Sequence, residues 1–411
     1  MTDVTGENSG NCKNRKSDEG GKGGKLQPKL RFKGFTDAWE QRALGELATF
    51  AKGAGYSKSD LVGKGKPIIL YGRLYTDYQT IIHDVNTFVI DRPGSIYSVG
   101  NEVIVPASGE TAEDIARASV VCRAGIILGG DLNIIYPKPS LSSVFLALVI
   151  SNGKEHVKLA RKAQGKSIVH IHNNDLKYIR ISYPDIREQM TVSHLFRCFD
   201  CLIAAAERKV LLLKKKKHAY LNHIFTQHLR FTGHTTPWQT KKLGELEREQ
   251  KIRLGRGKVI SENDITSTPG KYPIYSSSAR NNGEMGRYGL WMFNQELVTW
   301  SIDGGGSVFY RPKHRFSITN VCGFVQVLTN IDCPFLAYQM MYIHNKIHFD
   351  YTVKAHPSVI RKLYFLGVPS IEEQIKIGNF FQTLDSLITA TERKVNLLKK
   401  KKQAYLQRMF I

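Results

Sequence analysis

The sequence contains no apolar segment long enough to cross a membrane. Its longest uncharged apolar run covers residues 144–150, far short of the roughly 18 residues that a bilayer requires. Residues 1–25 are polar, rich in glycine, asparagine and lysine, and lack the apolar core of a secretory signal. We therefore expect a cytoplasmic protein with a disordered basic tail over residues 1–30.

Cysteine is scarce and scattered. The six cysteines do not form the closely spaced set of a disulfide-rich domain, which agrees with a reducing compartment. Cys198 and Cys201 have the spacing of a redox pair or half a zinc site. They fall inside a predicted helix, however, and an internal repeat carries Thr383 and Ser386 at the equivalent places. We interpret them as two small helix residues.

Motifs for catalysis are also missing. We find no glycine-rich S-adenosylmethionine loop, no amino-methyltransferase motif, no helicase Walker pair and no convincing nuclease cluster. Residues 165–167 resemble the end of a phosphate-binding loop, but Ala160 stands where that motif requires glycine. His344 and His348 have the spacing of a metal-chelating pair, but Asn345 replaces the glutamate of a metalloprotease motif. The chain is therefore expected to be neither an enzyme nor a metal protein on its own.

Acidic residues are in deficit. The 411 residues include 59 Lys and Arg against 36 Asp and Glu, which gives a formal charge of +23, and 42% of the residues are hydrophobic. This composition predicts about two to three globular domains. The charge favours a polyanionic partner, either nucleic acid or an anionic surface.

The chain is an internal repeat. The letters WEQRALGEL at 39–47 recur as WQTKKLGEL at 238–246, an offset of 199. Glu-Gln, ERKV and a run of four lysines, which begin at 188, 207 and 214, recur with an offset of 185. The first repeat is thus 14 residues longer. The architecture is a tail followed by a variable block and a shared helix, twice over.

The shared segments have the spacing of a coiled-coil seam. Key positions alternate by four and three residues in both segments: Phe199, Ile203, Ala206, Val210, Leu213, Lys217, Tyr220 and Ile224, then Leu384, Ile388, Thr391, Val395, Leu398, Lys402, Tyr405 and Met409. A pair of ordinary amphipathic helices in one core is the alternative. Lys217 and Lys402 would be poor core residues and plausible register markers. The runs 214–217 and 399–402 could form a solvated face, contact DNA or dock an acidic partner.

The variable blocks contain short β-like runs between turns, and each holds one apolar helix candidate, around Phe145 and around Phe335. We predict an α+β fold with two globular domains. Each is followed by a long helix, and the two helices pair as an antiparallel coiled coil. The predicted boundaries are 31–183, 184–230, 231–368 and 369–411.

Basic residues lie among aromatic and amide side chains in these blocks. Arg and Lys neutralise phosphates, whereas base reading needs side chains such as Arg and Asn that reach base edges. We take the clustered residues as candidate DNA contacts, although a solvated loop is the alternative for each one: Tyr71, Arg73, Tyr75, Ser108, Thr111, Lys158, Lys162, Lys166, Ser167 and His170 in the first block, and Arg253, Arg256, Lys258, Ser276, Ser277, Arg280, Asn281, Asn282, Arg311, Lys313, His314 and Arg315 in the second.

The duplicated segments resemble the specificity subunits of type I restriction-modification systems. The resemblance covers nearly the whole chain outside the tail. It is carried by segments 39–47 and 238–246, the Pro-x-x-x-Glu-Gln openings at 184–189 and 369–374, and the two ERKV segments. Residues 272–277, 282–283 and 300–306 also resemble one common class of target-recognition domain. One departure is that residues 163–167 and 353–357 differ, so the second block lacks the family's glycine and serine there.

The resemblance implies a non-catalytic specificity subunit. Each block would read one half of a bipartite, asymmetric DNA site, and the helices would set the spacer between the halves. Two modification subunits that bind S-adenosylmethionine would dock on the helices, and two ATP-dependent restriction subunits could join them. This chain would itself bind no cofactor. The alternative is a non-enzymatic coiled-coil scaffold that binds nucleic acid without preferring a two-part site.

Overall fold

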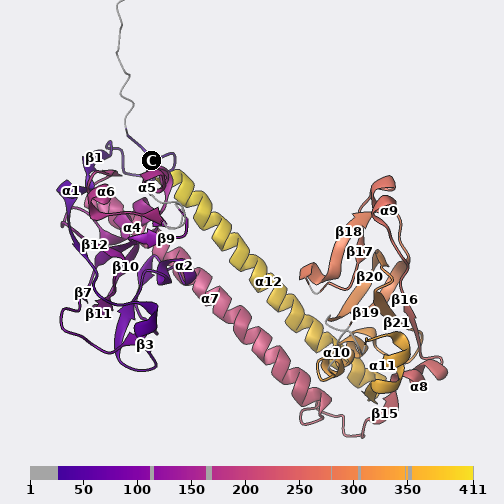
Figure 1. Ribbon diagram of the computed structural model, residues 1–411. Helices are drawn as coiled ribbons and strands as arrows, with labels where there is room; N and C mark the ends of the chain where they lie inside the picture. The colour runs from indigo at the N-terminus through magenta and orange to yellow at the C-terminus, as the bar shows by residue number, and fades with distance from the viewer. Residues whose placement is uncertain are drawn as a thin grey trace, which may run out of the picture. The chain divides into compact units, whose positions relative to one another are not determined.

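The computed structural model describes residues 26–111, 115–162, 169–278, 280–303, 307–347, 349 and 354–410 (Figure 1). The chain divides into two compact units. The first contains the chain up to Cys201 together with Lys399 onward, and the second is Leu202–Leu398. Both units combine strands and helices, which confirms the predicted α+β class.

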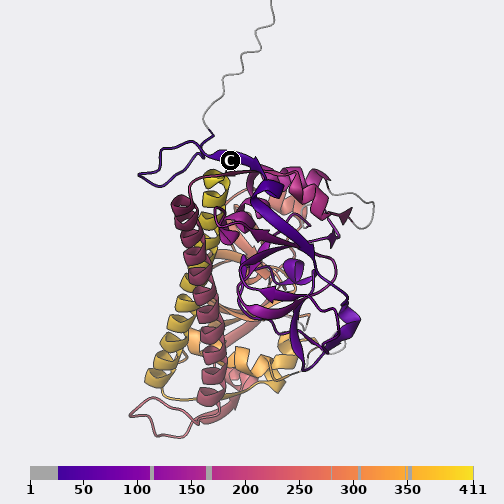
Figure 2. The same cartoon turned by 90° about the vertical axis from the view of Figure 1, so that its left-hand side faces the viewer.

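The first unit is built on two five-stranded sheets (Figure 2). In the first sheet, β8 is buried along its whole length and so lies centrally, as a continuous apolar run predicts. The strand order of this sheet is β2 (Ala48–Lys52), β12 (Leu132–Pro137), β8 (Glu102–Pro106), β10 (Ser119–Val121) and β5 (Ile81–Ile82). The second sheet has the order β3 (Leu61–Val62), β6 (Phe88–Val89), β4 (Lys66–Ile69), β11 (Ala124–Leu128) and β7 (Tyr97–Val99).

Short elements complete this unit. The apolar helix predicted around Phe145 is α4 (Ser143–Ser151), which is buried almost all round and contacts β8 and β10. The side chain of Ser142 caps it by accepting from the Phe145 N–H. The other elements are α1 (Leu44–Leu47), α2 (Arg73–Thr76), α5 (Gly153–Lys162), α6 (Asn173–Lys177), the 3-10 turn Lys58–Asp60, and the paired strands β9 (Ser108–Gly109) and β13 (Val169–His170).

The second unit has one six-stranded sheet. Its order is β16 (Ile252–Arg256), β21 (Cys322–Val327), β19 (Phe293–Ser301), β20 (Val308–Ile318), β17 (Tyr272–Tyr275) and β18 (Glu284–Tyr288). The helix predicted around Phe335 is α10 (Cys333–His344), which packs on β19 and β20 and is capped by Asp332. The remaining elements are α8 (Leu243–Arg248), α9 (Glu262–Ser267), α11 (Pro357–Leu363) and the 3-10 turn Arg280–Gly283.

The repeated WxxxxLGEL segment forms the same small assembly in each unit. In the first, β1 (Glu40–Ala43) pairs antiparallel with β14 (Arg180–Tyr183), and in the second β15 (Gln239–Lys242) pairs with β22 (Phe365–Val368). The repeated glycine is explained by close approach. A Cβ atom on Gly45 would lie 3.3 Å from the Lys177 Cβ, and one on Gly244 would lie 3.2 Å from the Arg361 carbonyl oxygen.

The two long predicted helices are α7 (Ile186–Phe225) and α12 (Ile371–Met409). The division of the chain falls within both, so each unit contains one part of each helix. Within each unit, the parts of α7 and α12 that belong to it lie side by side (Figure 1 and Figure 2). In the first unit Phe199 packs against Tyr405, and in the second Tyr220 packs against Phe380. The predicted seam positions are buried or half-buried except Tyr405, which is exposed.

The two seam lysines pair with aspartates. Lys402 donates to Asp200 in the first unit, and Lys217 donates to Asp385 in the second at 2.7 and 2.9 Å. Asp200 and Asp385 are equivalent in the repeat, as are the two lysines. The same pair therefore occurs twice with the roles of α7 and α12 exchanged. In the first unit Phe196 contacts Phe410 and Phe199 contacts Tyr405, and in the second Lys217 contacts Asp385 and Tyr220 contacts Phe380, so the two helices are antiparallel within each unit.

Three remaining sequence features can be placed. Cys198 and Cys201 are free, exposed residues on α7. His344 is buried and hydrogen-bonds to the Tyr364 hydroxyl at 2.6 Å, while His348 and residues 165–167 fall outside the described residues. Within the ranges that the structure describes, no group of three or more potential metal ligands occurs, and no helix is long and apolar enough to cross a membrane.

Candidate nucleic-acid interface

An ion pair between a half-buried arginine and a buried glutamate joins the start of each variable block to the start of its long helix. Arg31 Nε and Nη2 donate to the two carboxylate oxygens of Glu188, both at 2.7 Å. Arg230 donates in the same way to Glu373, at 3.0 and 2.6 Å. Both glutamates are almost fully buried. This hydrogen bonding raises the pKa of each arginine above its ordinary value. The repeated glutamate therefore belongs to the frame of each unit.

The glutamine that follows each of these glutamates, Gln189 or Gln374, also has a structural role. Gln189 accepts from the Ser142 N–H at 2.8 Å and donates to the Pro184 carbonyl at 2.9 Å. Gln374 accepts from the Asp332 N–H at 3.0 Å and donates to the Pro369 carbonyl at 3.0 Å. Each glutamine ties the start of a long helix to the loop before the buried helix of its unit. The repeated glutamine therefore also belongs to the frame of each unit.

In the first unit the structure brings three predicted contact residues together at the β9–β13 edge. The Tyr75 hydroxyl donates to the Ser108 carbonyl, and the Ser108 hydroxyl lies 3.1 Å from His170 Nδ1. Ser108 is buried, whereas His170 is exposed and stacks on His172. His170 is therefore the member of this cluster that is placed to meet a ligand, while Ser108 orients it.

The other predicted residues of this unit are dispersed. Tyr71 is exposed and packs edge-on against Tyr75. Arg73 is directed into the protein, where it contacts Asp77 at 3.3 Å and the Asp84 carbonyl at 3.2 Å. Thr111 and Lys158 are exposed. The Lys162 side chain, Lys166 and Ser167 fall outside the described part of the chain.

Arg311 is not available to DNA, which corrects the expectation for this residue. Its side chain is 1% exposed and donates to the Thr299 hydroxyl at 3.0 Å and the Asn282 carbonyl at 2.8 Å. The guanidinium lies 3.7 Å from the centre of the Tyr275 ring. Burial lowers the pKa of Arg311 to about 10, so it remains charged at neutral pH. It is an internal support for the turn at Arg280–Gly283.

That turn presents two asparagines. Asn281 and Asn282 are exposed and have left-handed backbones, with φ of 47° and 55°, which asparagine tolerates better than most residues. Of the serines before the turn, Ser276 is half-buried and accepts from the Thr319 hydroxyl at 3.1 Å, and Ser277 is half-buried. The Arg280 side chain lies outside the described residues.

The basic residues on the six-stranded sheet are mostly exposed. Arg253 and Arg256 on β16, the adjacent Lys258, and Lys313 on β20 are all exposed. His314 is half-buried, lies 3.1 Å from the Tyr275 hydroxyl through its Nε2, and stacks on Phe316. His314 thus packs on the sheet, while the four cations remain free to meet a phosphate backbone.

The aromatic partners of Arg315 were missed in the sequence. The Arg315 guanidinium lies 4.3 Å from the centre of the Trp291 ring and donates to the Tyr272 hydroxyl at 2.9 Å. Trp291 is 44% exposed. Strand pairing brings them together, because Asn294 is opposite Arg315 in the β19–β20 register. An arginine placed over the ring of an exposed tryptophan is an arrangement suited to nucleic acid. A hairpin prediction could have found the pair, because Trp291 lies two residues before the start of β19.

Comparisons with known proteins agree with this architecture. Residues 236–400 match the family model described as the type I restriction modification DNA specificity domain. A Mycoplasma pneumoniae protein assigned as a type I specificity subunit is 34% identical over 160 residues, which is 36% of this chain and 41% of that protein. A second protein of that organism, assigned as the N-terminus of such a subunit, is 48% identical over 90 residues, or 21% of this chain and 48% of the relative. The chain thus spans less than half the length of these two relatives.

The fold has been seen before. The crystal structure of a type I restriction-modification S subunit from M. genitalium superposes with a TM-score of 0.66 at 17% sequence identity. The match covers 94% of this chain and 99% of the other. At 17% sequence identity this match shows a shared fold only. Evidence of a common family comes from the matched domain and the Mycoplasma relatives. Residues 236–400 therefore carry a type I restriction modification DNA specificity domain, and the chain is similar to assigned type I specificity subunits over the stretches given above.

Proposed function

We propose that this chain is the sequence-specific DNA-binding subunit of a type I restriction-modification complex. Each variable block reads one half of a bipartite, asymmetric site. One observation carries the proposal: the same frame is built twice around different surfaces. The Arg31–Glu188 and Arg230–Glu373 pairs are equivalent, yet one unit carries two five-stranded sheets and the other a single six-stranded sheet. Two frames of the same construction suit partners that bind both units in the same way. Two variable blocks with different sheets suit two different half-sites.

The exposed side chains support DNA as the ligand. Arg253, Arg256 and Lys258 offer cations for phosphates, which position a protein without reading sequence. The exposed Asn281 and Asn282 are of the residue type that pairs with adenine edges. The second surface therefore combines groups for backbone contact with groups for base readout.

Catalysis is assigned to partner subunits. Two modification subunits would bind S-adenosylmethionine and methylate adenine, and ATP-dependent restriction subunits could join, while this chain binds no cofactor. Support for a partner that docks twice comes from leucines that are exposed at equivalent places of the repeat. These are Leu202 and Leu212 on α7, with Leu387 and Leu397 on α12. Exposed apolar residues repeated on both helices suit two copies of one apolar partner surface.

Equivalent clefts support the same conclusion. A cleft of about 610 Å³ in the first unit is lined by Arg31, Pro184 and Ile186, and one of about 450 Å³ in the second by Arg230, Pro369 and Ile371. These residues correspond in the repeat. We propose that the complex acts in the cytoplasm, and that α7 and α12 also set the number of unread base pairs between the half-sites.

Single-molecule methylation mapping tests the proposal. DNA from cells that express this chain with a modification subunit should carry methyladenine within one two-part motif of fixed spacing. The purified chain alone should transfer no methyl group from S-adenosylmethionine. A scaffold without bipartite specificity would instead leave methylation unrelated to any two-part motif, and that result would replace our proposal with the alternative.

A further inference from the structure

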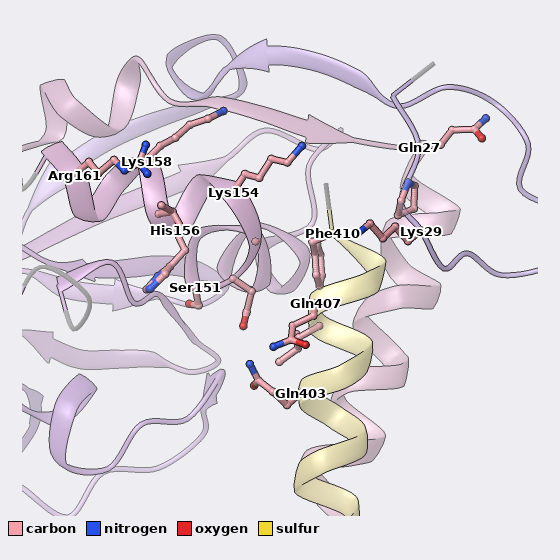
Figure 3. A pocket seen from close by; sticks show the side chains of 15 residues that line it. Gln27, Lys29, Ser151, Lys154, His156, Lys158, Arg161, Gln403, Gln407 and Phe410 are labelled. Carbon is pink, nitrogen blue, oxygen red and sulfur yellow. The ribbon is translucent and has the colours of Figure 1, made fainter. Parts of the chain in front are cut away.

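The first unit contains a cavity that the proposed half-site reading does not use. It has a volume of about 800 Å³ and lies between α5, residues 27–29 and the last turns of α12 (Figure 3). This volume is within the roughly 300–1,000 Å³ range of sites that hold small molecules or ligand groups. All of its lining residues belong to the first unit.

The lining is positively charged. Lys154, Lys158 and Arg161 are spaced by four and three residues on α5, so they share one face of that helix. Lys29 adds a fourth cation from residues 27–29 (Figure 3). None of the described lining residues is an aspartate or glutamate. Glu155 holds the Lys158 ammonium at 2.7 Å, but its own side chain is buried outside the lining. The cavity therefore retains a clear positive excess.

Amide groups face these cations. Gln403 and Gln407 project from α12 toward the α4–α5 segment, while Lys154 extends from α5 toward α12 (Figure 3). Leu406 and Phe410 are buried and form an apolar floor. Lysine, arginine and glutamine are among the side chains that contact DNA phosphates and sugars. Like charges at neighbouring helix positions repel one another, so this arrangement favours binding an anion over stabilising α5.

The chain's own tail is a poor occupant. Residues 1–25 carry five Lys and Arg against four Asp and Glu, so they do not complement a basic cavity. The chain as a whole, with its charge of +23, is suited to a strongly anionic ligand.

We propose that this cavity binds phosphate groups, and that the phosphodiester backbone of duplex DNA supplies them. The assignment of DNA as the source rests on the proposed function. The site would hold the duplex by its backbone, beside the half-site that the first variable block reads, and would add affinity without sequence preference. Lys158, predicted in the sequence as a DNA contact, thereby becomes a backbone contact.

The test compares two charge-reversing double variants of the full chain. Lys154→Glu with Arg161→Glu alters the cavity. Lys64→Glu with Lys66→Glu makes the same change of charge at exposed positions elsewhere in the unit. Affinity for a duplex of arbitrary sequence is measured between 50 and 200 mM salt. Each lost phosphate contact should reduce the slope of log K against log salt by about 0.9, which for two contacts weakens binding on the order of 50-fold at 0.1 M salt.

The control should leave the slope unchanged, and thermal unfolding should show that both variants are folded. Calorimetric titrations with pyrophosphate, ATP and an oligoglutamate peptide separate the possible sources. One outcome is that the cavity variant no longer binds pyrophosphate or ATP, while its slope of log K for DNA against log salt is unchanged. This would uphold a phosphate site but overturn DNA as the source of the phosphate. An unchanged slope without phosphate binding, or binding of oligoglutamate alone, would overturn the proposal. Methylation mapping with the cavity variant distinguishes a failure of this proposal from a failure of the proposed function. The two-part motif should persist even if the cavity binds nothing.

Discussion

Trp39 and Trp238 occupy equivalent positions in the two units, but their indole N–H groups differ in hydrogen bonding. Trp238 Nε1 donates to Glu373 at 3.1 Å and so joins the bidentate pair of that carboxylate with Arg230. Trp39 Nε1 is buried and has no hydrogen-bond partner within the described residues. The duplicated frame thus keeps its residue types while one copy has the more complete network. A repeat conserves positions more strictly than it conserves interactions.

The first prediction concerns these two networks. Replacing Glu373 by alanine leaves the half-buried Arg230 without its partner, which should cost about 3 kcal/mol of local stability, the lower end of the range for a buried pair. Glu188→Ala should cost about 1 kcal/mol less, because no tryptophan bond is lost with it. Hydrogen exchange at the starts of α12 and α7 measures both effects, and Glu372→Ala at an exposed neighbouring position is the control. Equal losses in the two units would show that the tryptophan bond contributes nothing.

A second prediction contrasts two arginines of the same strand, β20. Arg311→Ala removes a buried cation from the Tyr275 ring together with two hydrogen bonds, and should destabilise the second unit by roughly 3 kcal/mol. Arg315→Ala removes an exposed cation from Trp291 and should cost less than about 1 kcal/mol. It should instead weaken DNA binding roughly eightfold at 0.1 M salt, as expected for one phosphate contact. Thermal unfolding and fluorescence anisotropy separate the two. A stable Arg311 variant with weakened DNA binding would restore our original expectation for that residue.

The third and smallest effect concerns pH and should be confined to the second unit. Burial opposes ionisation of Glu247, but hydrogen bonds from Arg361 and the Leu254 N–H together hold the pKa of Glu247 below its ordinary value. The equivalent residue of the first unit is Ala48. A lowered carboxyl pKa contributes stability above the ordinary value of about 4.5 and loses it as the pH falls through the lower, folded value.

Glu247→Gln should therefore remove about 0.5 kcal/mol at pH 7, since both partners are partly exposed to solvent. The difference from the parent protein should shrink as the pH falls below 4.5 and vanish once Glu247 is protonated in the folded state. Urea unfolding followed at Trp300 in the second unit provides the measurement. A difference that does not change with pH below 4.5 would assign the effect to packing rather than to charge.

The helices and the frame could be predicted because their signals are local or duplicated. Four-three spacing marked both long helices, and Lys217 and Lys402 stood out because a lysine is unusual in a seam. The burial of Arg311 could not be predicted in this way. Its neighbours Pro312 and Lys313 are exposed, and its partners Tyr275 and Asn282 are supplied by other parts of the sheet and its turn. The pairing of Arg315 with Trp291 likewise depends on strand register, which no local pattern fixed.

The central claim is that two independent surfaces on a common frame read two half-sites. Exchange of residues 31–183 for the corresponding block of another family member, followed by single-molecule methylation mapping, tests it most directly. The exchange leaves the second unit, with its Arg230–Glu373 pair and six-stranded sheet, unaltered. We predict that one half of the methylated motif changes and the other half is retained. A motif altered in both halves, or in neither, would contradict the account.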